Sequence, residues 1–227
     1  MSETISLILV LVPALVIAIV FHEVAHGYVA KMLGDNTASM MGRLSLNPIR
    51  HIDPVGTLLV PGAMALVGGP IFGWAKPVPV VKNRLDNPRF GMMAVAAAGP
   101  GMNLVLALVG ATALGLFAPM LGIGIGAEPG IVAQGIYYFI LINVFLAVFN
   151  LLPIPPFDGS HIVEGLLPPP LARKYERLRP YGMLLFFALV AAVWFAPDLD
   201  ILGNTIGVPV FWLMERYIEL AGFIAGE

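Results

Sequence analysis

Long apolar stretches alternate with shorter polar links along the chain. The first stretch runs from Ile5 to Leu33, and two more run from Met92 to Phe117 and from Ile131 to Leu152. Each exceeds the roughly 20 apolar residues that a helix needs to cross a bilayer core. A shorter stretch follows at Tyr181–Phe195, and Ile201–Ala225 is apolar but carries three charged residues, so it either spans or lies in the interface. The pattern predicts an all-α polytopic membrane protein with about five transmembrane helices.

The region between the first two stretches, residues 35–90, has a different character, because seven prolines forbid a long uninterrupted helix. The alternation of polar and apolar residues over Gly42–Asn47 predicts a short strand. Val55–Phe72 reads as a re-entrant segment or a loop on the membrane face, and Phe72–Val80 as extended chain or an edge strand. Irregular backbone at membrane depth persists only where protein or water covers it. We therefore expect an irregular or β loop region that folds against the helices.

The composition supports a membrane protein and excludes most soluble classes. Apolar residues make up 59% of the chain and charged residues 11%, and the mean hydropathy is +0.89, whereas an ordinary soluble domain is about 25% charged. The net charge of -2, without a dense basic patch, gives no reason to expect nucleic acid as a partner. The absence of cysteine excludes disulfides, thiolate zinc sites and cysteine nucleophiles.

The basic residues predict how the chain sits in the membrane. The links at 35–90 and 168–180 carry six and four of the 12 Lys and Arg residues, while the glycine-rich turn expected at 122–130 carries none. The positive-inside rule places both basic links in the cytoplasm and the N-terminus outside. The segments His22–His26 and Asn150–Asp158 then lie toward the cytoplasmic side of the cell (inner or plasma) membrane.

The segment His22-Glu23-Val24-Ala25-His26 has the residues for metal-dependent hydrolysis. Histidines at positions i and i+4 share one helix face, so both imidazoles can reach one metal ion. Zinc lowers the pKa of a bound water to about 7, and Glu23 could take the proton as hydroxide attacks a carbonyl. The structural alternative is a pair of interfacial histidines near a helix end. Ionisable groups at this depth are costly and usually functional, which favours the metal site.

A catalytic zinc usually takes three protein ligands and leaves one position for water. No His or Glu occurs between Gly27 and Arg50, so the third ligand must come from elsewhere. Asp158 is the best candidate, because it follows an apolar stretch that ends on the same side, in a proline-rich turn; a capping Asp in a Pro-Gly turn is the structural alternative. His161 could exchange roles with Asp158, while His51 reads as a polar interfacial residue.

Three asparagines lie in the stretches Met92–Phe117 and Ile131–Leu152. Asn150 is close to Asp158 in sequence, and its carboxamide could donate to a scissile carbonyl or a developing oxyanion. For Asn103 and Asn143 we expect hydrogen bonds between helices.

Several segments together resemble the site-2 protease family of intramembrane zinc metalloproteases: Phe21–His26, Gly42–Pro48 with His51–Asp53, Phe72–Val80, Ala98–Asn103 and Phe149–Gly159. The resemblance covers the chain from about Val20 to Ile162. It implies that His22, His26 and Asp158 bind Zn²⁺. Glu23 would be the general base, and Asn150 would position the substrate backbone.

The resemblance also implies a catalytic core of three helices, formed by the first stretch and the stretches beginning at Met92 and Ile131. Residues 1–227 would form a single membrane-embedded peptidase domain, with the core at about 4–162 and C-terminal helices at about 180–225. Many family members carry a preceding transmembrane helix, and many bacterial members carry a PDZ or CBS domain. The loops here have no room for such domains, so we expect a minimal form.

The expected activity is the cleavage of transmembrane protein substrates in or near their helices, in regulated intramembrane proteolysis. An unwound substrate could add as a strand to an edge at Leu44–Asn47 or Val78–Val81. The main alternative is a non-proteolytic membrane metal-binding protein or transporter. An inactive scaffold is another, and a lipid-modifying di-metal enzyme would need many more than four histidines.

Overall fold

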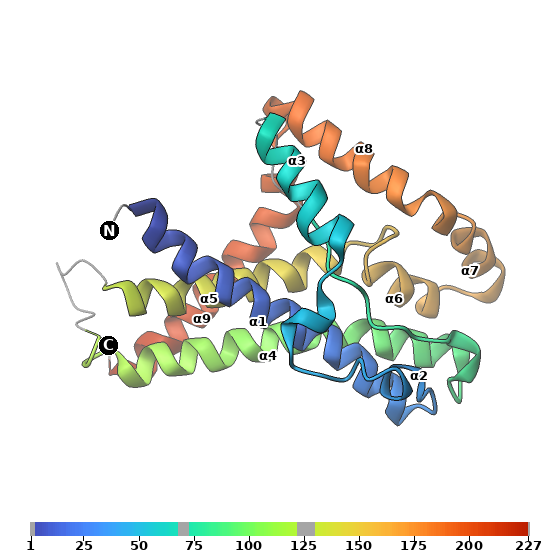
Figure 1. Cartoon of the computed structure of the whole chain (residues 1–227), viewed down its shortest axis with the longest axis horizontal. Coiled ribbons are helices and arrows are strands. Elements are labelled where there is room, and N and C mark those ends of the chain that lie inside the picture. Colours follow the sequence, from blue (N-terminus) through green and yellow to red (C-terminus); the bar gives the residue numbers. More distant parts are fainter. Residues whose placement is uncertain (1–2, 68–72, 122–129, 227) are drawn as a thin grey trace. The chain divides into compact units, whose positions relative to one another are not determined.

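The computed structural model describes residues 3–67, 73–121 and 130–226, and these contain α-helices, short 3-10 and π-helical turns, and no β-strand (Figure 1). The longer helices are α1 (Glu3–Met32), α4 (Pro88–Phe117), α5 (Ile131–Asn150), α8 (Gly182–Phe195) and α9 (Val208–Ala225). The shorter helices are α2 (Thr37–Met40), α3 (Val60–Val67), α6 (Gly159–Leu166) and α7 (Pro169–Glu176). The all-α class predicted from the sequence is confirmed.

Four stretches of the described residues are long and apolar enough to cross a membrane: Ile5–Met32, Pro88–Phe117, Ile131–Asn150 and Pro169–Phe195. The fourth begins earlier than expected, because the polar link before Tyr181 is itself helical. The second begins at Pro88, where a proline fits the first helical turn without losing a hydrogen bond. Helix α9 carries three charges and is not among the four.

The irregular region forms no strand in its described part. Residues 43–47 and 73–81 have no regular secondary structure, and the apolar segment between them forms a π-helix at Pro54–Leu59 followed by α3. Side chains take backbone groups that a sheet would pair: carboxylates of Glu23 and Asp35 accept the N–H groups of Val78 and Val81. Residues 68–72 and the turn expected at 122–126 lie outside the described residues.

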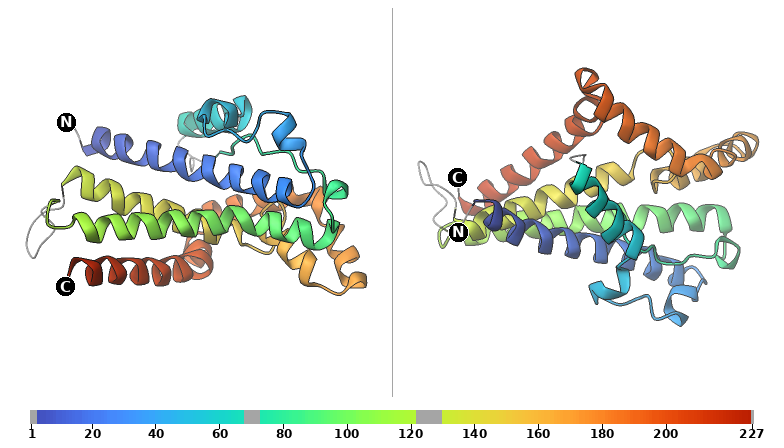
Figure 2. Two further views of the ribbon diagram at one scale, coloured as in Figure 1. Left: turned by 90° about the horizontal axis from the view of Figure 1, so that it is seen from below. Right: turned by 45° about the horizontal axis from the view of Figure 1, so that its top comes forward.

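The chain divides into two compact units. The first comprises Met1–Ala18, Pro100–Leu151 and Asp200–Glu227. In this unit the first half of α1, the second half of α4, and helices α5 and α9 lie side by side (Figure 2). The buried Asn103 Nδ2 donates to Asn143 Oδ1 at 2.9 Å and to the Ala18 carbonyl at 3.2 Å, which confirms the expected hydrogen bonds between helices.

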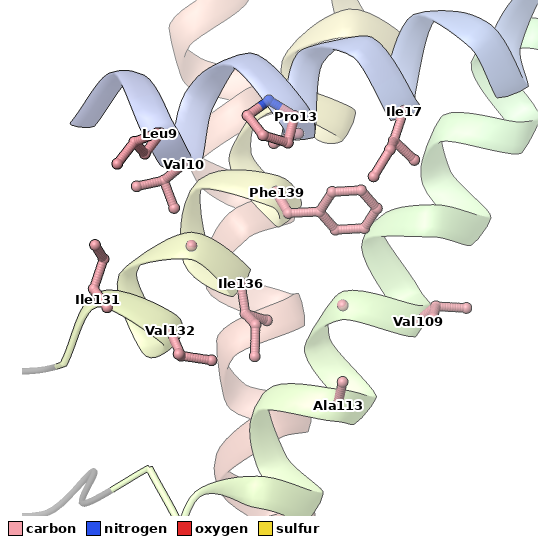
Figure 3. A pocket seen from close by; sticks show the side chains of 13 residues that line it. Leu9, Val10, Pro13, Ile17, Val109, Ala113, Ile131, Val132, Ile136 and Phe139 are labelled. Carbon is pink, nitrogen blue, oxygen red and sulfur yellow. The ribbon is translucent and has the colours of Figure 1, made fainter. Parts of the chain in front are cut away.

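An apolar groove of about 480 Å³ lies between α1, α4 and α5 in this first unit (Figure 3). Its lining includes Leu9, Ile17, Val109, Ile136 and Phe139, and no titratable side chain contributes to it. The groove suits hydrocarbon and provides no groups for hydrolysis. The polar chemistry lies in the second unit, which comprises Ile19–Gly99 and Leu152–Leu199.

A glycine allows α4 to approach α9 closely in the first unit. A Cβ added at Gly115 would lie 2.5 Å from the Ala221 carbonyl oxygen and 2.8 Å from Ile224 Cβ, whereas one added at Gly222 would meet nothing within 4 Å. The obstacle at Gly115 is backbone, so a helix must move to relieve it.

We therefore expect Gly115→Ala to lower the free energy of unfolding by about 1–3 kcal/mol, as overpacking typically does. Gly222→Ala should leave it unchanged or raise it by up to about 1 kcal/mol through helix propensity. Denaturant unfolding of both variants in detergent measures the difference. Equal stability of Gly115→Ala and wild type would contradict this close approach of the two helices.

Candidate metal centre

Two histidines and one aspartate meet in the second unit. His22 and His26 lie one turn apart on α1 with their ring centroids 4.6 Å apart. The Oδ2 atom of Asp158 lies 3.1 Å from His22 Nε2 and 3.3 Å from His26 Nε2. One ligand atom from each of the three residues lies within 4.8 Å of the others. The structure thus brings together the three residues that the sequence singled out as metal ligands.

A backbone carbonyl orients one of these imidazoles. His26 Nδ1 lies 2.7 Å from the Val95 carbonyl oxygen, so Nδ1 carries the hydrogen and donates it. In a neutral imidazole, Nε2 then presents a lone pair toward Asp158 Oδ2. Two acceptor atoms at this distance repel one another unless a proton or a metal cation lies between them. A hydrogen bond from the second nitrogen to a carbonyl is also the usual support of a metal-binding histidine, so these residues fit a zinc ion.

Helix α4 passes close to both imidazoles at a glycine. A Cβ at Gly99 would lie 2.5 Å from His26 Nε2 and 2.6 Å from His22 Cε1. Gly99 lies in a segment used for the resemblance, but sequence reasoning gave it no role of its own. Its position inside an apolar helix could have indicated a close contact, because alanine is the better helix former there by about 1 kcal/mol.

The carboxylate of Glu23 holds the irregular region against α1. Glu23 is half-buried, and its Oε2 accepts the Val78 N–H at 2.7 Å. The buried Asp35, beyond the end of the same helix, accepts the Val81 N–H at 2.6 Å and the Thr37 N–H at 3.0 Å. Burial alone would raise the pKa of the Asp35 carboxyl, but the hydrogen bonds from Thr37 and Val81 outweigh it and lower that pKa.

Two further buried polar residues stabilise this region. Arg43 donates to the carbonyls of Lys76, at 2.7 Å, and Pro77, at 3.3 Å, immediately before the residue that binds Glu23. His51 Nε2 lies 2.8 Å from the Ser45 carbonyl, to which it can donate. His51 was expected to be interfacial, but it is only 3% exposed, because the loop folds over it.

Two aromatic rings and a glycine contact hold the turn that carries Asp158. The buried Phe157 packs edge-on against Phe186 of α8 at 5.9 Å, and a Cβ at Gly182 would lie 3.1 Å from Pro155 Cβ. Asp158 occupies the N-cap position of α6, but its side chain makes no capping hydrogen bond. Its carboxylate turns to the histidines instead, so it does not act as a side-chain cap, the structural alternative considered from the sequence.

The alternative ligand His161 has different partners. Its ring nitrogens lie 2.8 and 2.9 Å from the guanidinium of Arg179. Burial and then the Arg179 charge lower the pKa of His161 to about 4, so the ring is neutral near pH 7. It does not belong to the group formed with His22 and His26.

Asn150, the expected substrate-positioning residue, is the last residue of α5 and belongs to the first unit. Its Nδ2 donates to the Leu146 carbonyl one turn earlier at 3.0 Å. A carboxamide has two N–H groups and a carbonyl oxygen, so this bond does not exhaust its capacity. Its role with a substrate stays a prediction.

Comparisons with known proteins agree with this centre. Residues 120–192 match the family described as Peptidase family M50. YwhC of Bacillus subtilis, named as a zinc metalloprotease, is 41% identical over 184 residues, which cover 81% of this chain and 81% of YwhC. Rip2 of Mycobacterium tuberculosis, named likewise, is 28% identical over 207 residues, which cover 88% of this chain and 70% of Rip2.

A third relative, MJ0611 of Methanocaldococcus jannaschii, is also named as a zinc metalloprotease and is 32% identical over 149 residues, 64% of each chain. No solved structure matches the chain significantly. Four apolar helices in the described residues are long enough to cross a bilayer, as an integral membrane protein requires. The extent of identity with YwhC assigns the chain to peptidase family M50, the site-2 protease family of membrane zinc metalloproteases.

Proposed function

We propose that the chain is a zinc-dependent intramembrane endopeptidase that hydrolyses peptide bonds in or near the transmembrane helices of substrate proteins. The observation that carries the proposal is the convergence of His22, His26 and Asp158 within an apolar chain, with Glu23 on the same helix. Membership of the family supports it. The membrane surroundings make a transmembrane helix the natural substrate.

In this proposal His22 Nε2, His26 Nε2 and Asp158 hold the ion. A set of two imidazole nitrogens and one carboxylate suits a catalytic zinc, since three protein ligands leave one position open. Zinc bound there would supply a Lewis acid, which would lower the pKa of a bound water to about 7 and polarise a carbonyl. The Val95 carbonyl orients the His26 imidazole, and the absence of a side chain at Gly99 leaves room for both imidazoles.

Glu23 is the general base. Its Oε2 is occupied by the Val78 N–H, which fixes the direction of the carboxylate. The second oxygen, Oε1, takes the proton from the attacking water and later gives it to the leaving amine. The same side chain thus holds the irregular region and moves the proton.

The substrate must be locally unwound, because helical hydrogen bonds shield its peptide groups. Of the two edges considered for strand addition, Val78–Val81 is the poorer, since Glu23 and Asp35 occupy two of its N–H groups and Pro79 has none. We favour Leu44–Asn47. The basic links support a cytoplasmic active site and an outside N-terminus, and residues 1–227 serve as one peptidase domain.

The base is tested by Glu23→Gln, which keeps the shape of the side chain and removes its basicity. We expect cleavage of a reporter transmembrane substrate in detergent to fall by about 100-fold or more, while zinc content stays at the wild-type level. Chelator-treated wild type should lose both.

The same variant separates the proposal from a metal-binding protein or transporter. In such a protein Glu23 would serve as a ligand or a charge, and Glu23→Gln would weaken metal binding. A wild-type chain that binds zinc but cleaves no transmembrane reporter would overturn the peptidase assignment.

Asn150→Ala tests the positioning of the substrate backbone. We expect kcat/KM for the reporter to fall by about 100-fold, as for loss of one oxyanion donor, with zinc content unchanged. Asn83→Ala, on the exposed turn Lys82–Arg84 (η3), is the control and should cleave like wild type. Equal rates for all three proteins would show that Asn150 has no such role.

Gly99→Ala tests the close approach of α4 to the metal ligands. The added methyl would overlap His26 Nε2, so we expect zinc affinity to fall by at least about 10-fold. Gly101→Ala, two residues along the same helix, meets nothing within 4 Å and should bind zinc like wild type. Competition with a chelator of known affinity measures both. Wild-type affinity in Gly99→Ala would place the zinc elsewhere.

A further inference from the structure

A buried carboxylate on α6 has no part in the metal group. Glu164 is 7% exposed, and a carboxylate this buried requires partners. Lys82 Nζ lies 2.7 Å from its Oε1, and Arg179 Nη2 pairs with its Oε2. Burial alone would raise the pKa of Glu164, but the Lys82 hydrogen bond and the Arg179 charge outweigh it and lower that pKa. Glu164 is therefore ionised and held from two sides.

The two cations come from different parts of the second unit. Lys82 directly follows the extended segment whose Val78 and Val81 N–H groups bind Glu23 and Asp35. Arg179 begins the short turn Arg179–Tyr181 (η4) that leads into α8. Glu164 thus connects the segment that touches the base with the start of α8.

The same helix carries a metal ligand at its other end. Asp158 has helical backbone angles at the N-cap of α6, and His161 and Glu164 follow at steps of three residues along one side of the helix. Arg179 contacts both of these later residues. At the C-terminal end of α6, Arg89 of α4 donates to the Gly165 carbonyl at 2.9 Å. These contacts fix the rotation of α6 about its axis, and with it the direction of the Asp158 carboxylate.

We propose that Glu164 is a positioning residue for the metal centre: through Lys82 it couples the helix that carries Asp158 to the segment that holds Glu23, and through Arg179 it couples that helix to the start of α8. The inference rests on the proposed function, because it assigns Asp158 as a ligand and Glu23 as the base. Loss of the ion pair lets α6 turn and the extended segment shift. The metal geometry and the hydrogen bond to the base then loosen together.

The test measures zinc affinity of the full chain in detergent by chelator competition, and the visible spectrum of the Co²⁺-substituted protein. We expect Glu164→Gln and Lys82→Met each to weaken zinc binding by about 10-fold, the lower end of the usual effect of outer partners, and to alter the Co²⁺ spectrum. Lys82→Arg keeps the charge, so this variant should have the zinc affinity and the Co²⁺ spectrum of the wild type. The double variant should be no weaker than Glu164→Gln alone, because Glu164→Gln already removes the Lys82–Glu164 pair, and the other carboxylate near Lys82, Glu176 at 3.5 Å, is exposed.

Glu219→Gln is the matched control. Glu219 pairs with Arg216 at 2.8 Å on the exposed side of α9, and exposed pairs contribute little. Wild-type affinity in Glu164→Gln, additive losses in the double variant, or an equal loss in Glu219→Gln would each overturn the proposal. If Glu164→Gln does not fold, Lys82→Met and Lys82→Arg decide, since Lys82 is half-buried.

These outcomes are distinct from failure of the proposed function. If the wild-type chain binds zinc but does not cleave the reporter, the peptidase assignment is wrong. The effect of Glu164 on zinc affinity is measured independently of cleavage, so it is still tested in that case.

Discussion

Two imidazole nitrogens and one carboxylate oxygen face one another at hydrogen-bonding distance. His26 donates its Nδ1 hydrogen to the Val95 carbonyl, so in a neutral imidazole its Nε2 faces the Asp158 oxygen at 3.3 Å with a lone pair. Such an arrangement inside an apolar chain is unfavourable without a positive charge between the atoms. A divalent cation relieves the repulsion and uses the lone pairs. The surrounding structure directs these three side chains at one point, and the contacts described below serve to hold them there.

The supporting structure uses side chains where many proteins use a sheet. The extended segment at residues 73–81 pairs with no strand among the described residues, and its backbone is held by the carboxylates of Glu23 and Asp35 and by the guanidinium of Arg43. The residue proposed as the base therefore also fixes the loop beside it. The aromatic contact of Phe157 and the ion pairs of Glu164 hold the turn and helix that carry Asp158.

The long helices and the three proposed metal ligands could be predicted from the sequence, because local spacing and local turn residues determine them. The spacing of His22 and His26 fixes their common helix face, and the prolines after α5 mark the turn that carries Asp158. Alternation over Gly42–Asn47 was misleading, because a strand also needs a neighbouring strand to pair with, and the described residues contain none. Gly99 was missed because its importance depends on which helix lies against α1. The partners of Glu164 lie 82 and 15 residues away in the chain, and no local pattern indicates them.

The central claim is that one zinc ion binds between α1 and the start of α6, and X-ray absorption at the zinc edge of the purified chain tests it most directly. We expect one zinc per chain, with two imidazole nitrogens and one carboxylate oxygen at the distances usual for zinc proteins, about 2.0–2.1 Å and about 2.0–2.2 Å. The imidazole scattering should disappear in His22→Ala/His26→Ala. A spectrum without imidazole scattering in the wild-type chain, or one that the double variant leaves unchanged, would contradict it.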